Sequence, residues 1–253
     1  MNKKANHPVQ TTEKSLKLIK RLQEVDGARI QDLEGYQGMT KGTIHNHLST
    51  LREQGFVVKN GREYQLSMWF LTLGGGIRNR NSLYQAGRAK VQQLAEDTGM
   101  LANLMTEEDG KGVYLYQAEG NYAVDLDTHV GYRIHLHNTG IGKAILAFFS
   151  HERVIGIAER WGLPRTTENT ITNQTELMEE LETIRNRGYA IDHEERTEGL
   201  ACIAAPVRLD EQVLGAISIS APTQRLGNEE FDEEIIREVE STANEVSLAI
   251  KYN

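Results

Sequence analysis

The stretch from Thr40 to Gly55, TKGTIHNHLSTLREQG, constrains the fold of this chain more than any other. Ile44, Leu48 and Leu51 recur at i, i+4 and i+7, which places one apolar stripe along a helix. The opposite arc is polar and rich in hydrogen-bonding groups, and it consists of Lys41, Thr43, His45, Asn46, Ser49 and Thr50. A glycine such as Gly55 commonly closes a helix. The sequence therefore predicts an amphipathic helix with one buried face and one polar face.

Two short strand-like segments follow this helix. FVVK (56–59) and REYQL (62–66) flank an Asn60-Gly61 pair, which is the strongest short-range signal for a two-residue hairpin turn. A polar-faced helix followed by a hairpin predicts a winged helix-turn-helix whose recognition helix enters the major groove of DNA. Periodicity alone leaves open an alternative, a solvated amphipathic helix beside a ribbon.

Charge is distributed unevenly along the chain and favours DNA binding by its first part. The formal net charge of −8 would by itself argue against nucleic acid. Residues 1–80, however, hold 13 Lys and Arg against 7 Asp and Glu, a net charge of +6. The remainder holds 15 against 29, a net charge of −14. A basic part beside an acidic part is expected when only one domain meets phosphate.

The bulk composition excludes several classes of protein. A length of 253 residues suits one large or two smaller domains. No run of about 18 apolar residues occurs, so we expect no membrane-spanning helix and no membrane partner. The first residues carry charges but no apolar segment, so we expect no signal peptide. A single cysteine, Cys202, excludes an internal disulfide and favours a reducing, cytoplasmic location.

The residues ahead of the recognition helix predict two more helices, which gives the order of a winged helix. Residues 30–33 predict a short second helix. Residues 11–25 show helical spacing with Thr11 or Thr12 as the N-cap, and their predicted apolar stripe consists of Leu16, Ile19, Leu22 and Val25.

Residues 67–80, SMWFLTLGGGIRNR, begin as a helix that is apolar on most of one side. A helix this apolar beside a small domain is more often an interface than a free surface, so we expect it to pack against a second copy of the chain. The three glycines 74–76 would each weaken a helix by roughly 1 kcal/mol relative to alanine. We interpret them as a hinge between domains, and a tight helix–helix crossing remains the alternative.

From Ser82 onward the pattern changes to strands and helices. The predicted helices are 82–98, about 140–149, 151–161, 174–187 and 228–251. The predicted strands are 101–107, 113–120, VDLDT (124–128), YRIHLH (132–137), 189–192, 201–209 and 213–220. Strands lying between N- and C-terminal helices indicate one antiparallel sheet with helices on its sides, an α+β fold.

Residues 139–144, TGIGKA, open a predicted helix directly after a strand. Free N–H groups and the positive end of the helix dipole would suit an anion such as a carboxylate. A nucleotide-binding P-loop is excluded because it needs glycine and Ser or Thr where this chain has His137 and Ala144. The alternative is that the glycines let the helix lie close to the sheet.

Two sets of residues could form a catalytic or metal site, but the sequence pattern supports each only weakly. Cys202 could act as a nucleophile with His193 or His137 as its base, although a buried structural cysteine is commoner. His135, His137, Asp192 and His193 could assemble a metal site, but no ligand-spacing motif supports one. We therefore expect no metal.

Two further groups of polar residues allow both a functional and a structural interpretation. Asp192, Glu194 and Glu195 could form an acid pair for hydrolysis, yet a solvated turn also explains such a run. Ser218 and Ser220 alternate along a strand, so they share one face, which either lines a small polar pocket or faces outward. We expect no enzyme activity and no cofactor.

Taken together, these blocks resemble the isocitrate-lyase-regulator (IclR) family of bacterial and archaeal transcription regulators, and the details are similar to a haloarchaeal member. The resemblance covers nearly the whole chain, and the spacing among its blocks matches the family. It rests on KGTIHNHLSTL (41–51), GFV (55–57), YQL (64–66), HLHNTGIGKAILA (135–147), GYAIDHEE (188–195), GLACIAAPV (199–207) and AISISAP (216–222).

The resemblance implies an N-terminal winged helix, a linker helix and a C-terminal GAF-like effector domain, in a dimer or tetramer. It also implies a pocket for a small carboxylate or aromatic acid. The matching positions here are Gly140, Ile141, Asp192, Leu200, Cys202, Ser218 and Ser220. The chain departs from the family at Asn46, often an arginine there, and at His193, which replaces an acid. Asn46 could bond adenine in a bidentate manner.

We therefore expect a regulator that binds a palindromic operator and responds to a small acid. The expected domains are 8–67 (winged helix-turn-helix), 68–81 (linker helix) and 82–253 (effector domain). The residues expected to contact DNA are Lys41, Thr43, His45, Asn46, Ser49 and Thr50, with Arg62 in the wing. In the alternative hypothesis the C-terminal domain only oligomerises, because Ile141 is larger than the small residue common there and narrows the pocket.

Overall fold

The computed structural model describes residues 6–226 and 233–252. Packing divides the chain into two compact units, one ending at Ile77 and the other beginning at Arg78. Each unit has a hydrophobic core of its own. Within the described residues, every helix falls short of the length and apolar character needed to cross a membrane.

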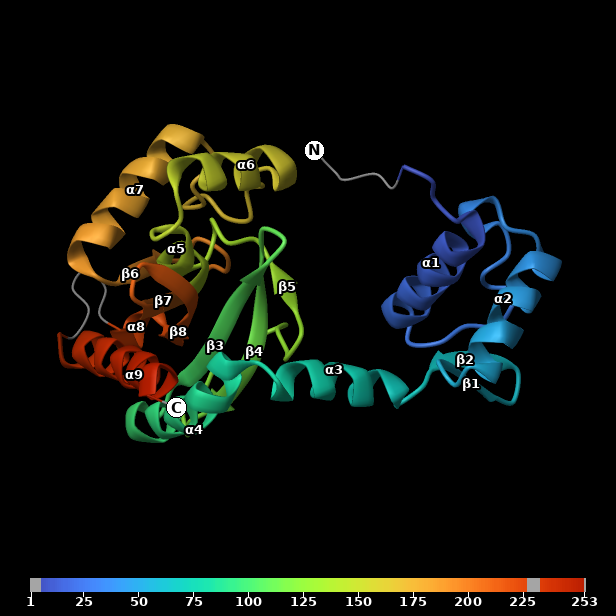
Figure 1. Cartoon of the computed structure of the whole chain (residues 1–253), viewed down its shortest axis with the longest axis horizontal. Helices are drawn as coiled ribbons and strands as arrows, with labels where there is room; N and C mark the ends of the chain where they lie inside the picture. Colours follow the sequence, from blue (N-terminus) through green and yellow to red (C-terminus); the bar gives the residue numbers. More distant parts are fainter. Residues whose placement is uncertain (1–5, 227–232, 253) are drawn as a thin grey trace. The chain divides into compact units, whose positions relative to one another are not determined.

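The N-terminal unit has the element order of a winged helix (Figure 1). Its elements are α1 (Gln10–Glu24), a 3₁₀ turn η1 (Tyr36–Gly38), α2 (Lys41–Glu53), β1 (Val57–Asn60) and β2 (Glu63–Leu66). The predicted stripe of the recognition helix is confirmed, because Ile44, Leu48 and Leu51 are buried in the core of this unit.

Three predictions for the segments before α2 are wrong, wholly or in part. Helix α1 is capped by Val9 rather than by Thr11 or Thr12, and Leu16 and Val25 of the predicted stripe are 53% and 37% exposed. Leu22 of the stripe is buried as predicted and Ile19 packs partly buried against the core, whereas the buried Leu18 was not predicted. The predicted second helix is a run of turns, in which residues 32–34 each donate to the carbonyl three residues earlier.

The hairpin is confirmed, but its turn lies one residue later than predicted. Asn60 is part of β1 and pairs with Glu63, so the two loop residues are Gly61 and Arg62. Gly61 has a φ of 60°, a value that glycine adopts without strain, and a glycine with positive φ at the first loop position is typical of a type II′ turn.

Helix α3 (Trp69–Asn79) runs through the three glycines 74–76 without interruption. The glycines therefore do not break the helix, and the boundary between the two units falls just after them. No side chain of α3 is buried within the described chain. Its exposed apolar side chains, with the preceding Met68, are Trp69, Leu71, Leu73 and Ile77, between 42% and 78% exposed.

The C-terminal unit contains an antiparallel sheet whose strand order, within the described residues, is β5-β4-β3-β8-β7-β6. The strands are β3 (Leu101–Glu108), β4 (Lys111–Glu119), β5 (Arg133–Ile134), β6 (Ala190–His193), β7 (Leu200–Leu209) and β8 (Gln212–Pro222). The helices are α4 (Ser82–Thr98), α5 (Gly140–Leu146), α6 (His151–Trp161), α7 (Gln174–Arg187), α8 (Thr223–Leu226) and α9 (Glu233–Tyr252). The predicted α+β fold with a GAF-like domain is confirmed.

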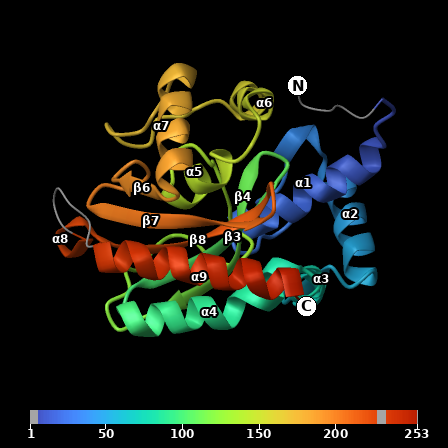
Figure 2. The ribbon, with the colours of Figure 1, turned by 60° about the vertical axis from the view of Figure 1, so that its left-hand side comes forward.

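Helices cover both faces of this sheet. Figure 2 shows α4 and α9 side by side on one face, with α5, α6 and α7 on the other. One apolar core lies under α4 and α9, and a second lies under α5 and α7. The sheet face toward α5 also carries the polar residues described below.

Two strand predictions in this unit are wrong. Residues 124–128 form no strand; Asp127 is held by Arg196, and the Thr128 hydroxyl accepts a hydrogen bond from Gln117. Of residues 132–137, only 133 and 134 pair with β4. Residues 228–232 of the predicted closing helix lie outside the described residues.

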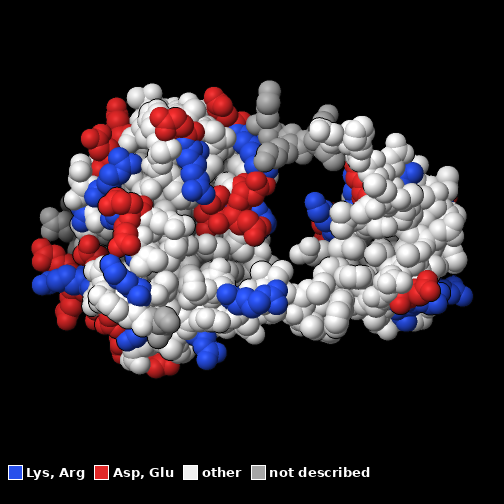
Figure 3. Space-filling view, viewed as in Figure 1, with Lys and Arg blue, Asp and Glu red and all other residues white. Residues whose placement is uncertain are grey.

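The charge asymmetry is a property of the composition rather than of one visible patch. In Figure 3, acidic and basic side chains intermingle on the visible face of the C-terminal unit. The visible face of the N-terminal unit is largely uncharged in the same view.

Candidate functional site

The recognition helix α2 is capped at both ends by hydrogen bonds, one to a side chain at its N-terminus and two within the backbone at its C-terminus. At the N-terminus, Thr40 Oγ1 accepts from the Thr43 N–H at 3.3 Å. At the C-terminus, the Phe56 N–H donates to Leu51 O and the Gly55 N–H to Arg52 O, which is a Schellman motif. These caps and the buried stripe fix which face of α2 is directed outward.

Six of the predicted DNA-contacting side chains belong to α2, and the seventh, Arg62, lies in the loop between β1 and β2. Five of them are exposed, namely Lys41, His45, Asn46, Thr50 and Arg62, and two are half-buried, namely Thr43 and Ser49. Several already have partners: Lys41 forms an ion pair with Glu34 at 2.9 Å, and the Thr50 hydroxyl donates to Asn46 O at 3.1 Å. Within residues 6–226 and 233–252, the Asn46 amide has no hydrogen-bond partner, so both of its polar atoms are available to a base edge.

The residues predicted for the effector converge on one end of the sheet. Along neighbouring strands, Asp192 of β6 pairs with Cys202 of β7, and Cys202 pairs with Ser220 of β8. Ser218 lies on the same face one row further on, beside Asn103 of β3. Leu200 starts β7 and is half-buried. The alternative in which the two serines face outward is wrong.

The start of α5 lies against this row of strand residues. The Gly140 N–H donates to Asp192 Oδ2 at 3.2 Å. A Cβ atom on Gly140 would lie 3.3 Å from the Cys202 sulfur. Gly142 has even less space, because a Cβ there would lie 2.3 Å from Leu136 O. Close packing of the helix on neighbouring backbone therefore explains Gly142, whereas Gly140 faces the polar cluster.

The cluster is closed in this structure. Five of its side chains are at most 5% exposed, namely Ile141, Asp192, Cys202, Ser218 and Ser220. Burial raises the pKa of Asp192, although Lys143 and two backbone N–H groups oppose the shift. Hydroxyl, thiol, carboxyl and N–H groups thus face one another in the interior of the unit.

Cys202 is not activated as a nucleophile. Burial raises the pKa of its thiol to about 12, with nearby Asp192 adding to the shift. The Ser218 and Ser220 hydroxyls and the Ile141 N–H lie near the sulfur and oppose the shift. A nucleophilic cysteine needs a lowered pKa, so this thiol has the character of a structural or ligand-contacting group.

Several residues around the cluster escaped the sequence prediction. Asn103 is 3% exposed, and its side chain lies between Ser218 and Gln117, with distances of 3.4 and 3.0 Å. Tyr114 is buried nearby, and its charged neighbours include Asp192. The available signal was an asparagine inside the apolar run LANLM (101–105), since a buried amide must find partners.

The candidate metal site is not assembled among the described residues, and the interpretation of Asp192 and Glu195 as part of a solvated turn is wrong, because both are buried. The rings of His135 and His137 lie 5.5 Å apart, and His137 Nε2 is 3.2 Å from Pro164 O. Among the described residues, no three His, Cys, Asp or Glu side chains are grouped to hold a metal ion. Glu195 is buried beside Lys143 rather than exposed in a solvated turn.

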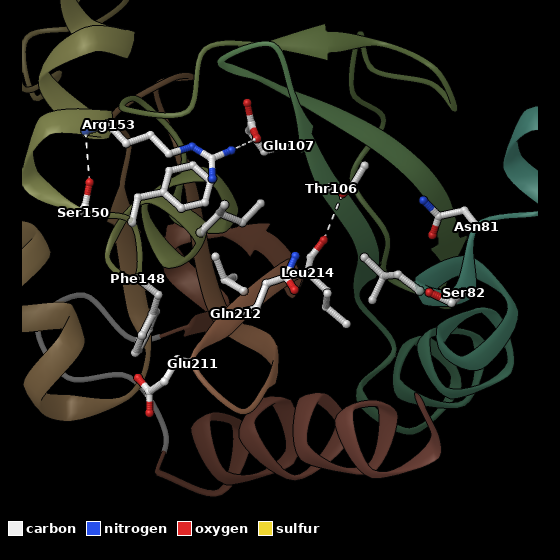
Figure 4. Close-up of a pocket in the computed structure, with 14 residues that line it drawn as sticks. Asn81, Ser82, Thr106, Glu107, Phe148, Ser150, Arg153, Glu211, Gln212 and Leu214 are labelled. Atoms are coloured by element: carbon white, nitrogen blue, oxygen red, sulfur yellow. Dashed lines mark hydrogen bonds and ion pairs between the residues drawn. The ribbon is translucent and has the colours of Figure 1, made fainter. Parts of the chain in front are cut away.

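A cavity of about 730 Å³ lies elsewhere in the C-terminal unit, between the start of α4, the end of β3 and the β7–β8 hairpin (Figure 4). Arg153 borders it, 2.5 Å from Glu107 and over the Phe149 ring. The Thr106 hydroxyl donates to Leu214 O. None of the predicted effector residues lines this cavity, and these polar groups already have partners within the chain.

An outward polar recognition helix followed by a wing, together with a separate antiparallel-sheet unit that holds a buried polar cluster, defines the class of DNA-binding transcription regulators with an appended sensing domain. A family model described as the IclR helix-turn-helix domain matches residues 11–61. A second, described as bacterial transcriptional regulator IclR C-terminal, matches residues 78–248. The chain therefore belongs to the IclR family of transcription regulators.

Individual relatives agree with this assignment. The probable HTH-type transcriptional regulator ArcR of Halobacterium salinarum is 35% identical over 242 residues, covering 94% of this chain and 92% of that protein. The crystal structure of the Thermotoga maritima IclR aligns with a TM-score of 0.78 at 25% identity, covering 96% of this chain and 99% of that one. An IclR homologue from Microbacterium hydrocarbonoxydans complexed with 4-hydroxybenzoate has the same fold, with a TM-score of 0.79 at 20% identity over 94% and 100% of the two chains.

Proposed function

We propose that this chain is a ligand-responsive regulator that binds a palindromic DNA operator as a homodimer or homotetramer. The observation that supports this most is the outward polar face of α2, fixed by the buried stripe on its other side and followed directly by the wing. Residues 8–67 would form the DNA-binding domain, 68–81 the linker helix and 82–253 the effector domain.

In this proposal α2 reads bases and the wing touches the phosphate backbone. Asn46, exposed and without a side-chain partner among the described residues, bonds a base edge, with adenine as the matching acceptor and donor pair. Lys41, Thr43, His45, Ser49 and Thr50 contact neighbouring bases or phosphates. Arg62, at the tip of the hairpin, contacts phosphate.

Binding of selected duplexes by two variants tests this assignment. Asn46→Ala should relax base preference at one position of each half-site, with about 1–3 kcal/mol lost against the preferred base. Arg62→Ala should weaken binding to all duplexes alike and reduce the salt slope by about 0.9 for each lost phosphate contact, hence by about 2 in a dimer. Equal, sequence-independent effects of both changes would contradict base reading by Asn46.

The exposed apolar face of α3 supports the proposed dimer. Four large side chains, Met68, Trp69, Leu71 and Ile77, are each at least 48% exposed. Such a cluster usually marks an interface, and a palindromic operator requires two recognition helices related by a two-fold axis.

The effector in this proposal is a small carboxylic acid bound in the cluster at the start of α5. Gly140, Ile141, Asp192, Leu200, Cys202, Ser218 and Ser220 would contact it. N–H and hydroxyl donors near the Cys202 sulfur suit a carboxylate, and the relative complexed with 4-hydroxybenzoate accommodates an acid in the same fold. Binding must differ in strength between two states of the protein if it is to change DNA binding.

The closed state of the cluster favours a second candidate, in which residues 82–253 only oligomerise. Thermal shift of the full chain against a panel of organic acids, 4-hydroxybenzoate included, separates the two candidates. Stabilisation that is lost in Gly140→Ala supports the effector site, because the added methyl group narrows the cluster. The matched control is Gly156→Ala in α6, where the Cβ meets nothing within 4 Å. If no acid stabilises the wild type, the oligomerisation candidate is favoured.

A further inference from the structure

A second cavity lies beside the effector cluster, on the side of α5 that faces α7. Its volume is about 330 Å³, at the small end of the range for small-molecule sites. Its charged walls come from α5 with Lys143, from α7 with Glu180 and Arg187, and from Glu195 just after β6. None of the seven residues assigned to the effector lines it.

Lys143 supplies a buried positive charge to this cavity. Its side chain is 2% exposed, and Nζ donates to Glu180 Oε1 at 3.1 Å and to Glu195 Oε1. An ammonium group has three hydrogens, and these two carboxylates take one each. Within the described part of the chain, one hydrogen remains for a further acceptor.

Two more polar atoms, both buried and both on residues that line the cavity, have no hydrogen-bond partner among the described residues. One is Oε2 of Glu195, whose side chain is 9% exposed. The other is Nη2 of Arg187, which lies 3.7 Å from Glu180, too far for a hydrogen bond. The Arg187 Nε donates to Tyr189 O at 2.6 Å, which fixes the guanidinium group at the wall. Native proteins rarely leave buried polar atoms unpaired, so these atoms indicate a missing partner.

The unpaired atoms define the chemistry of that partner. The donors on Lys143 and Arg187 suit an anionic acceptor, and the Glu195 oxygen suits a hydrogen donor close to it. We propose that this cavity is a second ligand site, which takes a small carboxylic acid carrying a hydroxyl or amino group next to the carboxylate. The carboxylate pairs with Lys143 and Arg187, and the neighbouring group donates to Glu195.

This site is joined to the effector cluster by one carboxylate. The Glu195 N–H donates to Asp192 Oδ1 at 2.8 Å, and the Gly140 N–H donates to Asp192 Oδ2 at 3.2 Å. The Thr170 hydroxyl holds Glu195 O at 2.6 Å, so the segment that carries Glu195 is fixed from its other side. A ligand bound to Glu195 therefore acts on the Asp192 carboxylate, which also accepts the hydrogen bond from Gly140 at the start of α5.

Calorimetric titration of the full chain with three acids of equal carbon skeleton tests the site. L-lactate carries a hydroxyl group, L-alanine carries an amino group, and propionate carries neither. We expect lactate or alanine to bind with a dissociation constant of about 1 mM or tighter and propionate to bind at least tenfold more weakly. Whichever of lactate and alanine binds more tightly shows whether a hydroxyl or an amino group donates to Glu195. If propionate binds equally well, or if none of the three binds, the proposal is overturned.

Matched variants locate the binding. Arg187→Met should weaken the binding at least tenfold, whereas Arg185→Met should leave it unchanged. Arg185 lies on the same helix and also donates Nε to a backbone carbonyl, that of Ala147, but it does not line the cavity. If Arg187→Met does not fold, Glu195→Gln replaces it, and this variant should bind the better acid with less preference over propionate. Binding that survives these changes but is lost in Gly140→Ala belongs to the effector cluster and overturns the proposal.

Discussion

Three glycine-to-alanine substitutions in helices of the C-terminal unit should change its stability in three different ways. The helix-propensity gain is about 1 kcal/mol at Gly156 inside α6 and at most that at Gly140 and Gly142 in the first turn of α5, so the main differences come from the space around the new methyl group. At Gly156 a Cβ meets nothing within 4 Å. At Gly140 it lies 3.2–3.4 Å from Asp192 and Cys202, whereas at Gly142 it lies 2.3 Å from Leu136 O and 2.6 Å from Leu136 Cα.

The magnitudes follow from these distances. Gly156→Ala should stabilise the unit by about 1 kcal/mol, which raises the melting temperature by roughly 2–4 °C for a domain of this size. In Gly142→Ala the obstacle is backbone, so the cost lies at the upper end of the about 1–3 kcal/mol typical of overpacking. The net loss is then about 2 kcal/mol, or roughly 4–8 °C. Gly140→Ala should be close to neutral, because mild crowding offsets the gain.

Trp161 fluorescence during urea unfolding measures these differences in a Trp69→Phe background. The chain has two tryptophans, and Trp69 lies on α3 in the other unit, so the remaining signal reports on residues from Arg78 onward. If Gly142→Ala is as stable as Gly156→Ala, the close approach of α5 to the Leu136 backbone is wrong.

Three further predictions concern single side chains. Burial lowers the pKa of His137 to about 4 from 6.5, so the unfolded chain binds more protons than the folded one between these pH values. The free energy of unfolding should therefore fall by up to about 3 kcal/mol as the pH drops from 6.5 to 4. His137→Gln should reduce this pH dependence, measured by urea titration. Because burial raises the pKa of the Cys202 thiol to about 12, iodoacetamide at pH 8 should label it only in urea, and rapid labelling of the folded protein, detected by mass spectrometry, would refute the assignment. Leu71→Asp should convert the oligomer to a smaller species in light scattering, whereas the neighbouring Thr72→Asp should not; an unchanged mass for both variants would exclude α3 as the interface.

The sequence predicted correctly those helices in which only one set of apolar residues could form the buried stripe. In α2, apolar and polar residues separate cleanly, so the stripe of Ile44, Leu48 and Leu51 was unambiguous. In α1 the run LKLIKRL offers two overlapping stripes, and packing in the unit buries Leu18 rather than Leu16. Periodicity cannot choose between such stripes, because the choice depends on the neighbouring elements.

The failed strand prediction at 124–128 has a different cause. Its alternating pattern is that of a strand, but the side chains are used for tertiary hydrogen bonds and ion pairs, as with Asp127 and Arg196. Whether a segment pairs with the edge strand of a sheet depends on the path of the preceding loop. The alternation of residues within the segment does not determine that path.

The residue pattern indicated the glycine-rich helix start at 139–144 and the pair Ser218 and Ser220, whereas the complete candidate effector cluster was predicted from the family resemblance. Strand pairing brings Asp192, Cys202 and Ser220 into one row, although the sequence separates them widely. The buried positions of Asn103 and Lys143 could be suspected from polar residues inside apolar runs. Their partners required the fold, since the residues they contact are distant in the chain.

We propose that acid binding in the C-terminal unit alters DNA binding by the N-terminal unit. The most direct test is the affinity of the full chain for DNA from upstream of its own gene, measured with and without an acid that stabilises the protein. We expect the acid to change the DNA affinity at least about fivefold, in either direction. This change should be absent in Gly140→Ala and retained in Gly156→Ala. An affinity unchanged by every stabilising acid, or equal for this DNA and a scrambled duplex, would contradict it.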